Sequence, residues 1–295
     1  MRKFIIGTDW WSDCDDVVAM RLLVSAHKRG EIEICGISID ACMEYSAASV
    51  DGFLTSEGVG GIPIGIDLEG SDFGGPIRYQ QRLATYAKRY KRNEDAEDAL
   101  SLYRRILAES EDKVEIIEIG FTQVLAALLM SEGDDISPLT GLELVRDKVS
   151  KFWIMGGRWD ADGAKEHNFS RNERACRAAH ILCEKCPVPI SFLGFEAGFD
   201  VFTGGELKEG DVLYDVLRDF RAFKGRESWD PMLTLMAIIG DEEKAGYKTV
   251  RGRASVDADT GANHFAESEN GRHAYVIRMH AADYYKNEIN ALIAK

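Results

Sequence analysis

The segment that decides the fold is Gly7-Thr8-Asp9-Trp10-Trp11-Ser12-Asp13-Cys14-Asp15-Asp16. It follows a short apolar run at 4–7 and precedes residues 15–29, whose apolar side chains recur at helical spacing. A strand that passes through an acidic turn into a helix is the opening unit of an α/β sheet. Because ligands of open α/β sheets bind at the carboxyl ends of the strands, we expect the functional site at this turn.

The rest of the chain continues the alternation of strands and helices. Continuous apolar runs of this kind are typical of a parallel sheet that helices cover on both faces. Further strands are predicted at 32–39, 62–66, 114–119, 152–155 and 189–193, and helices at 76–90, 96–109, 122–130, 173–186, 229–239 and 281–294. An antiparallel pair is predicted at 250–256 and 273–279. The sequence therefore predicts an α/β fold with an open, mostly parallel central sheet and a small C-terminal antiparallel addition, in a single domain of residues 1–295.

Composition excludes several classes of partner. The 295 residues carry 36 Lys and Arg against 50 Asp and Glu, a net charge of −14. A surface this acidic repels nucleic acid and anionic lipid, so we expect neither as a partner. The apolar run after Lys3 is too short for a signal peptide, and no run approaches 18 apolar residues. Six dispersed cysteines favour reduced thiols, and we expect a cytoplasmic protein.

Four aspartates within eight residues form the most informative cluster: Asp9, Asp13, Asp15 and Asp16. The helix dipole stabilises carboxylates in a first helical turn, which accounts for Asp15 and Asp16 alone. It does not account for Asp9 at the strand tip or for the mutual repulsion of four carboxylates. Clustered carboxylates commonly hold a hard cation such as Ca²⁺ or Mg²⁺, and we interpret the turn as a metal site.

The spacing of Asp9, Asp15, Asp16 and Ala19 resembles the signature of the inosine-uridine preferring nucleoside hydrolases. It is most similar to the bacterial branch with an Asp-x-Asp-Asp metal loop and a Trp-Asp pair near the C-terminus. The resemblance extends over nearly the whole chain. Its further motifs, in order, are Ile119-Gly120-Phe121-Thr122-Gln123, Glu166-His167-Asn168-Phe169, Gly194-Phe195-Glu196-Ala197-Gly198 and Ser228-Trp229-Asp230-Pro231.

The resemblance implies Ca²⁺-dependent hydrolysis of the N-glycosidic bond of ribonucleosides, which gives free base and ribose. One Ca²⁺ per subunit would be held by the side chains of Asp9, Asp16 and Asp230 and by the carbonyl of Thr122. Asp9 would also accept the proton of the attacking water as the general base. Asp15, Glu166 and Asn168 would bind ribose hydroxyls. The family also implies a homodimer or homotetramer.

The sequence departs from the family pattern in places that concern the leaving base. Gly7 stands where a first aspartate is usual, and Gln123 replaces an asparagine. Trp229 stands where many members carry a histidine that protonates the base. Trp229 is therefore a candidate for stacking on the base or, alternatively, a core residue. Asp40, at the end of a predicted strand, is a candidate for hydrogen bonding to the base or for a turn role.

Two other hypotheses stay open. The missing histidine and the altered metal loop are consistent with a catalytically weakened protein that still binds ribose or nucleoside. A metal-dependent phosphohydrolase with Asp9 as nucleophile is the third hypothesis, and it is disfavoured because Trp11 stands two residues after Asp9, where such enzymes need an aspartate.

Overall fold

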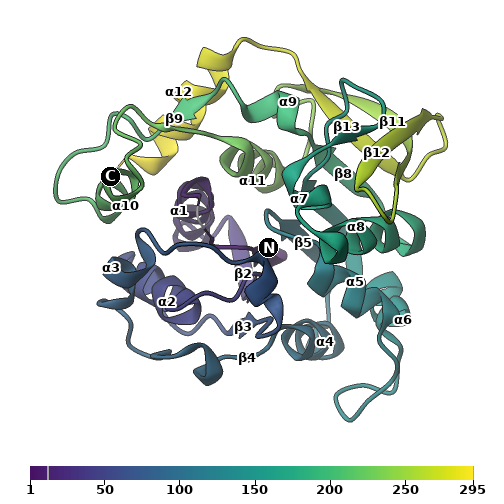
Figure 1. Ribbon diagram of the computed structural model, residues 1–295, viewed down its shortest axis with the longest axis horizontal. Helices are drawn as coiled ribbons and strands as arrows, with labels where there is room; N and C mark the ends of the chain where they lie inside the picture. The colour runs from purple at the N-terminus through teal and green to yellow at the C-terminus, as the bar shows by residue number, and fades with distance from the viewer. Residues whose placement is uncertain (12, 295) are drawn as a thin grey trace.

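The computed structural model describes residues 1–11 and 13–294 (Figure 1). The first half of the chain alternates strands and helices, and its first strand leads into the acidic turn within 7–16. Its elements are β1 (Arg2–Thr8), α1 (Asp15–Lys28), β2 (Ile32–Ile39), α2 (Ser46–Ser56), β3 (Ile64–Ile66), α3 (Gln80–Ala84), β4 (Glu97–Asp98), α4 (Ala99–Glu109), β5 (Val114–Glu118), α5 (Gln123–Met130), α6 (Gly141–Lys148) and β6 (Val149–Met155), with 3-10 turns at Gly70–Phe73 and Asn93–Asp95.

The second half adds more helix than the sequence predicts and a group of late strands. Its elements are β7 (Ala164–Lys165), α7 (His167–Ser170), α8 (Glu173–Lys185), β8 (Ile190–Leu193), α9 (Phe195–Gly198), β9 (Phe202–Thr203), α10 (Val212–Phe220), β10 (Arg226–Glu227), α11 (Trp229–Ile239), β11 (Tyr247–Val256), β12 (Ala262–Glu267), β13 (His273–Arg278) and α12 (Ala282–Ile293).

The central sheet has eleven strands in the order β4-β3-β2-β1-β5-β6-β8-β13-β11-β12-β7. Every pairing from β4 to β13 is parallel, and β13 pairs antiparallel with β11, β11 with β12, and β12 with β7. The predicted fold class is therefore confirmed, and the antiparallel addition extends the main sheet. The chain runs outward from β1 in both directions, so β1 and β5 flank the switch point where such sheets bind ligands.

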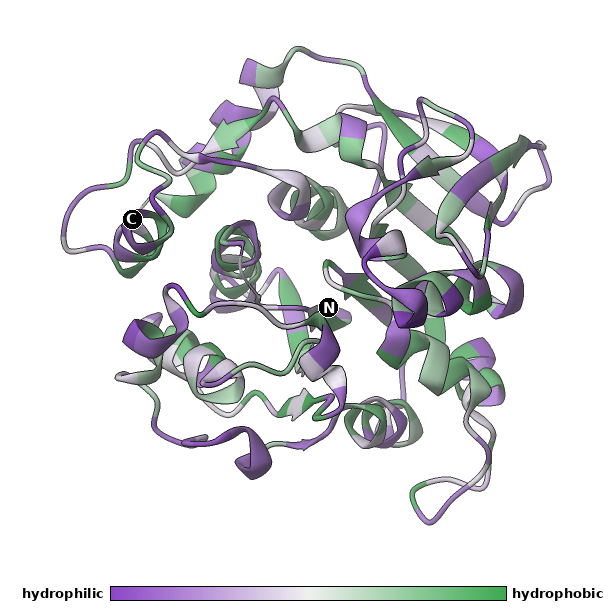
Figure 2. Cartoon of the chain, in the orientation of Figure 1, coloured by the Kyte–Doolittle hydropathy of each residue, from purple (hydrophilic) through white to green (hydrophobic). Residues whose placement is uncertain are grey.

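Two hydrophobic cores lie on the two faces of the sheet. One contains apolar side chains of α1, α2, α11 and α12, and the other those of α4, α5, α6 and α8. Figure 2 shows hydrophobic colour on the central strands and hydrophilic colour on the outer loops. No helix among residues 1–11 and 13–294 is long and apolar enough to cross a membrane.

The helix predicted at 76–90 is wrong over most of its length, since only Gln80–Ala84 is helical. The helix ends early because a side chain of α2 accepts hydrogen bonds from backbone N–H groups that follow the helical residues. Asp51 of α2 accepts hydrogen bonds from the backbone N–H groups of Lys88 and Arg89, at 2.7 and 2.8 Å. These N–H groups satisfy a buried carboxylate instead of continuing a helix.

Candidate functional site

The turn after β1 is held by hydrogen bonds to the first helical residues. The hydroxyl of Thr8, the last residue of β1, donates to Oδ1 of Asp16, and the N–H of Trp10 reaches the same oxygen at 3.2 Å. Trp10 has a left-handed backbone, with φ of 47°, which non-glycine residues seldom adopt. Its indole is fully buried, and Nε1 donates to Oγ of Ser49 at 2.8 Å. Trp10 is therefore an anchor of the turn, outside the cavity.

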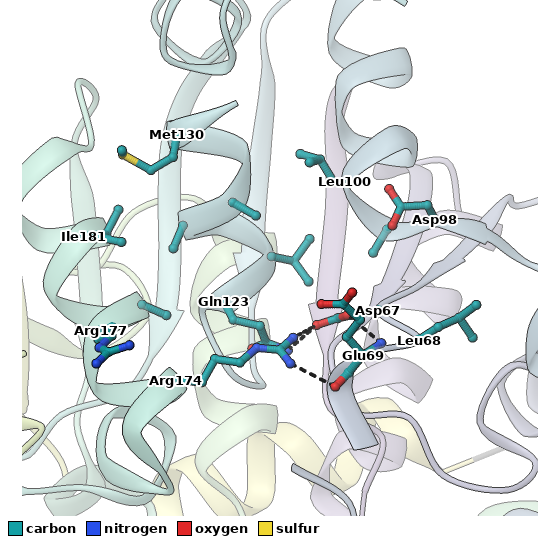
Figure 3. A pocket seen from close by; sticks show the side chains of 15 residues that line it. Asp67, Leu68, Glu69, Asp98, Leu100, Gln123, Met130, Arg174, Arg177 and Ile181 are labelled. Carbon is teal, nitrogen blue, oxygen red and sulfur yellow. Dashed lines mark hydrogen bonds and ion pairs between the residues drawn. The ribbon is translucent and has the colours of Figure 1, made fainter. Parts of the chain in front are cut away.

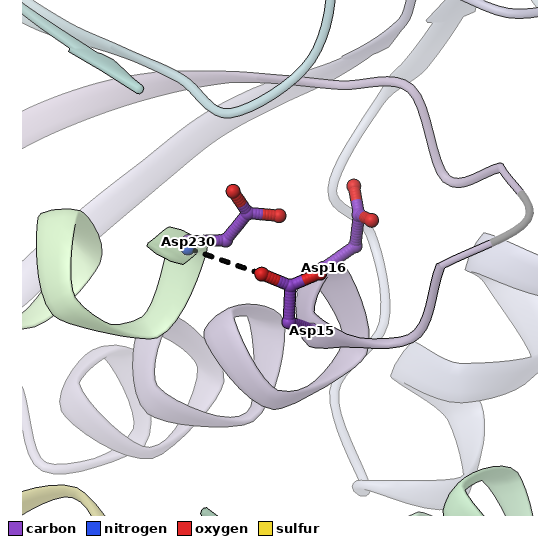
Figure 4. A group of neighbouring side chains, drawn as sticks. All are labelled: Asp15, Asp16 and Asp230. Carbon is purple, nitrogen blue, oxygen red and sulfur yellow. Dashed lines mark hydrogen bonds between the residues drawn. The ribbon is translucent and has the colours of Figure 1, made fainter. Parts of the chain in front are cut away.

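Three carboxylates converge at this turn, as Figure 4 shows. Asp15 and Asp16 begin α1, and Asp230 is the second residue of α11, which packs against α1. One carboxylate oxygen from each lies within 4.8 Å of the other two. The N–H of Asp230 also donates to Oδ2 of Asp15 at 3.3 Å. Burial raises the pKa of all three carboxyl groups well above the usual range, and repulsion between neighbouring carboxylates adds to this.

Asp9 lies beside this trio without belonging to it. Its Oδ1 accepts a hydrogen bond from the N–H of Trp11 at 3.0 Å, and the residue lines the same cavity as the three carboxylates. Burial raises the pKa of Asp9 to about 8, with further contributions from Asp15 and Asp13. A carboxyl group with this pKa titrates near neutral pH, and a divalent cation bound beside it would favour the ionised form that can accept a proton.

The donor set fits a hard divalent cation. The cavity of about 320 Å³ is lined by six carboxylate residues, namely Asp9, Asp13, Asp15, Asp16, Glu166 and Asp230, and the one Lys or Arg among its described lining residues is Arg226. Buried carboxylates need compensation, and an all-oxygen donor set is the one that Ca²⁺ and Mg²⁺ prefer. The group Asp15, Asp16 and Asp230 could hold such an ion.

Thr122 occupies the cap position before α5 and is buried. Its carbonyl accepts the helical hydrogen bond of the Ala126 N–H at 2.9 Å. Thr122 is not among the described residues that line the cavity. From the segment after β5, the lining residue is Ile119. The structure therefore does not bring the predicted carbonyl ligand into the described cavity lining.

Glu166 and Asn168 lie at the cavity wall opposite the turn, on the cap and first turn of α7. Oε2 of Glu166 accepts from the N–H of Gly157 at 3.0 Å, and Oε1 accepts from the N–H of Asn168 at 2.9 Å. Asn168 donates from its amide to the carbonyl of Met155 at 3.2 Å. Both polar side chains are thus held rigidly, and burial raises the pKa of Glu166 to about 7.

Aromatic rings close the cavity on two sides. Trp11 stacks on His167, with ring centroids 5.5 Å apart and an interplanar angle of 12°. Trp229 stacks on Phe195 at 5.4 Å and 26°. All four residues line the cavity. The cavity lining therefore combines a group of carboxylates with planar aromatic rings, which suits a sugar that carries an aromatic ring.

Asp40 is placed away from the cavity lining. It follows β2, is fully buried, and lies beside Glu118 of β5. Burial raises the pKa of Asp40 well above its usual range, and that of Glu118 to about 7. The two carboxyl groups form a buried pair behind the turn.

Arg226 is a site residue that the sequence motifs do not indicate. Its Nε and Nη2 donate to the two carboxylate oxygens of Asp13 at 2.7 and 2.5 Å, a bidentate pair that joins β10 to the acidic turn. The available signals were an unexplained fourth aspartate and an arginine four residues before Asp230. Nothing in their separate motifs indicates that residues 213 positions apart meet.

A second cavity, of about 680 Å³, lies between α4, α5, α8 and the loop after β3 (Figure 3). Its polar groups are engaged with one another: Arg174 pairs with Asp67 and Asp72, and Gln123 donates to Asp67 at 3.3 Å. Gln123 also donates to the carbonyl of Asp40. This second cavity is lined by residues other than the carboxylate trio.

The chain matches no family model and no curated protein by sequence. Solved structures match it over nearly its whole length. An inosine-uridine preferring nucleoside hydrolase from Bacillus anthracis aligns with a TM-score of 0.67 at 16% identity, covering 99% of both chains. The chain has the nucleoside hydrolase fold. The type III effector XopQ, solved in complex with adenosine diphosphate ribose, aligns with a TM-score of 0.72 at 15% identity, covering 99% of this chain and 93% of that one.

The effector protein XOO4466 aligns similarly, with a TM-score of 0.71 at 15% identity and the same coverage. The TM-scores show that the three structures share the fold of this chain. At identities of 15–16%, the chemistry of this chain has to be argued from its own residues.

Proposed function

We propose that the protein hydrolyses the N-glycosidic bond of ribosyl compounds with one Ca²⁺ per subunit. The observation that carries the proposal is the convergence of Asp15, Asp16 and Asp230 beside Asp9 in a cavity that also contains Glu166 and Asn168. The nucleoside hydrolase fold supports it. In this proposal the side chains of Asp9, Asp16 and Asp230 hold the ion, as the family resemblance implies. The fourth implied ligand, the Thr122 carbonyl, would have to reach the ion from outside the described cavity lining.

A bound divalent cation would lower the pKa of water and polarise the ribose hydroxyls. The chain itself supplies the remaining functions. Asp9 accepts the proton of the attacking water, because it lies in the cavity beside the trio and a bound cation would keep its carboxyl group ionised. Glu166 and Asn168, fixed by backbone contacts, accept or donate hydrogen bonds to the ribose hydroxyls. The stacked rings exclude bulk water from the reacting bond.

A panel of ribonucleosides tests this function. We expect free ribose from at least one nucleoside, loss of release after chelation, and recovery when Ca²⁺ is restored. Metal analysis of the purified protein should give one ion per chain. Phosphate release from phosphomonoesters, with no ribose release, would instead support the phosphohydrolase hypothesis.

The second candidate is a protein that binds a ribosyl ligand without turnover. Trp229 at the cavity favours it, because an indole N–H is too weak an acid to protonate a leaving base, and this one donates to the carbonyl of Phe195 at 2.8 Å. The likeness to XopQ, solved with adenosine diphosphate ribose, is also consistent with it. Binding of that ligand without hydrolysis of any nucleoside would favour this candidate. We infer that the chain acts as a homodimer or homotetramer, which light scattering tests.

A further inference from the structure

Three aromatic rings form a continuous row that leads out of the cavity. The first two, Trp229 and Phe195, line the cavity and stack at 5.4 Å. Phe199 continues the row, with its ring 6.1 Å from that of Phe195 and nearly parallel to it at 10°. The exposed fractions of Phe195 and Phe199 are 38% and 49%. Core packing therefore does not account for the outer two rings.

The inner ring of the row, Trp229, is fixed by its surroundings. Nε1 of Trp229 donates to the carbonyl of Phe195 at 2.8 Å, which sets the indole against α9. Gly198 makes this contact feasible, because a Cβ at position 198 would lie 2.5 Å from Cδ1 of Trp229. Exposed aromatic rings that are held rigid lose little conformational entropy when a planar ligand covers them.

Two guanidinium groups lie against the row. Cζ of Arg226 is 5.6 Å from the ring centroid of Trp229, and Cζ of Arg158 is 5.9 Å from that of Phe195. Arg158 pairs with Asp160, and both side chains are 46% exposed. An ion pair this exposed contributes little net stability, so an anionic ligand can compete for the guanidinium. The aromatic row therefore presents ring faces for stacking, with guanidinium groups beside them.

We propose that the aromatic row is a subsite for a second planar ring, and that the substrate is a dinucleotide-type compound. This inference rests on the proposed function. The ribose of the scissile bond occupies the cavity, an anionic linker passes Arg158, and the distal base stacks on Phe199. A nucleoside, whose one base is attached directly to the ribose, leaves the outer ring of the row uncovered.

The leaving group follows from the same contacts. In a dinucleotide with a pyridinium riboside, water forms the new C1′–O bond as the C1′–N bond breaks. The pyridine leaves with the bonding electron pair as a neutral molecule, and the water proton passes to Asp9. Such a leaving group needs no acid, which suits a site where the side chain at position 229 of the cavity lining is an indole, not an acidic group. A cationic ring also complements the acidic lining.

Calorimetry on the full chain with Ca²⁺ tests the subsite, with ADP-ribose and ribose 5-phosphate as probes. We expect ADP-ribose to bind about ten-fold tighter or more, since base–aromatic stacking contributes about that factor. Phe199→Ala should remove most of this advantage and leave ribose 5-phosphate binding unchanged, while Phe199→Trp should retain it. Tyr86→Ala is the matched control, because Tyr86 is 43% exposed and lies outside the row. NAD⁺ should release nicotinamide.

The outcomes separate the subsite from the proposed function. Equal affinity for the two probes, unchanged by Phe199→Ala, would overturn the subsite while nucleoside hydrolysis could still stand. Nucleoside cleavage without nicotinamide release from NAD⁺ would overturn the assigned substrate class. If no ribosyl compound binds and none is cleaved, the proposed function itself fails, and the inference fails with it.

Discussion

Gly7 and Glu118 are register partners on the adjacent parallel strands β1 and β5, and the carboxylate of Glu118 fills the space that a side chain at position 7 would need. A Cβ on Gly7 would lie 2.0 Å from Oε2 of Glu118. Glu118 is fully buried, and its Oε1 accepts from the N–H of Gly120 at 2.9 Å. The carboxylate of Glu118 on β5 therefore occupies the space beside position 7 of β1.

This relationship predicts a compensating pair of substitutions. Gly7→Ala should lower the free energy of unfolding by about 1–3 kcal/mol, because the new methyl overlaps a carboxylate with no room to move. Gly7→Asp should be destabilising for the same reason, and combining it with Glu118→Gly should recover much of that loss by moving the carboxylate from β5 to β1. Urea denaturation of the single and double variants measures the coupling energy. Additive effects of the two changes would contradict the direct contact.

A second prediction concerns the stability of the carboxylate trio. Without a cation, repulsion among buried carboxylates destabilises the fold, so Asp230→Asn should melt at a higher temperature than the wild type in chelator. Calcium at about 100 times its Kd should stabilise the wild type by about 2.7 kcal/mol and the variant much less. Differential scanning calorimetry with and without Ca²⁺ gives both comparisons. A wild type indifferent to Ca²⁺ would contradict the metal site.

A third prediction separates proton transfer from ribose binding. Asp9→Asn keeps the shape of the side chain but removes its basicity, so kcat should fall by about 10²–10⁴. Asn168→Ala should chiefly raise KM, because it removes a hydrogen-bonding group for the ribose and leaves the general base, Asp9, unchanged. Steady-state kinetics on the best nucleoside of the panel measures the split. Near-normal kcat for Asp9→Asn would show that another group accepts the proton.

A fourth prediction concerns the leaving group. If Trp229 stacks on the departing base and favours its protonation, Trp229→Ala should reduce hydrolysis of inosine far more than that of p-nitrophenyl riboside, which leaves without protonation. The two substrates are compared by kcat/KM. Equal losses of kcat/KM on both substrates would show that the indole only packs in the aromatic row and does not favour protonation of the base.

A fifth prediction uses a histidine remote from the site. Burial lowers the pKa of His273 from 6.5 to about 4, and its Nδ1 accepts from the N–H of Ala254 at 3.1 Å. Since the unfolded chain binds the proton more readily, this residue costs stability as the pH falls from 6.5 to 4, on the order of 3 kcal/mol in total. His273→Gln keeps an acceptor and should flatten that part of the stability profile relative to the wild type. Parallel profiles would contradict the assignment.

The sequence predicts the fold well where apolar runs are long and well bounded. The helix predicted at 229–239 coincides with α11, and the antiparallel pairing of β11 with β13 is confirmed. It fails where tertiary contacts override local preference, as at 76–90, and it missed α2, whose serine- and alanine-rich sequence shows little periodicity. For the site, local motifs locate Asp9, Asp15 and Asp16, but the partnership of Asp13 with Arg226 depends on a contact that no local pattern encodes.

The carboxylate trio is drawn from α1 and α11, whose contributing residues Asp15 and Asp230 stand 215 positions apart. During synthesis, the first half of the site emerges long before the second. A chain that ends before α11 lacks Asp230, so it cannot assemble the three-carboxylate group. On the proposed function, such a chain would bind no cation at this site and would be inert toward ribosyl compounds until α11 has docked on α1.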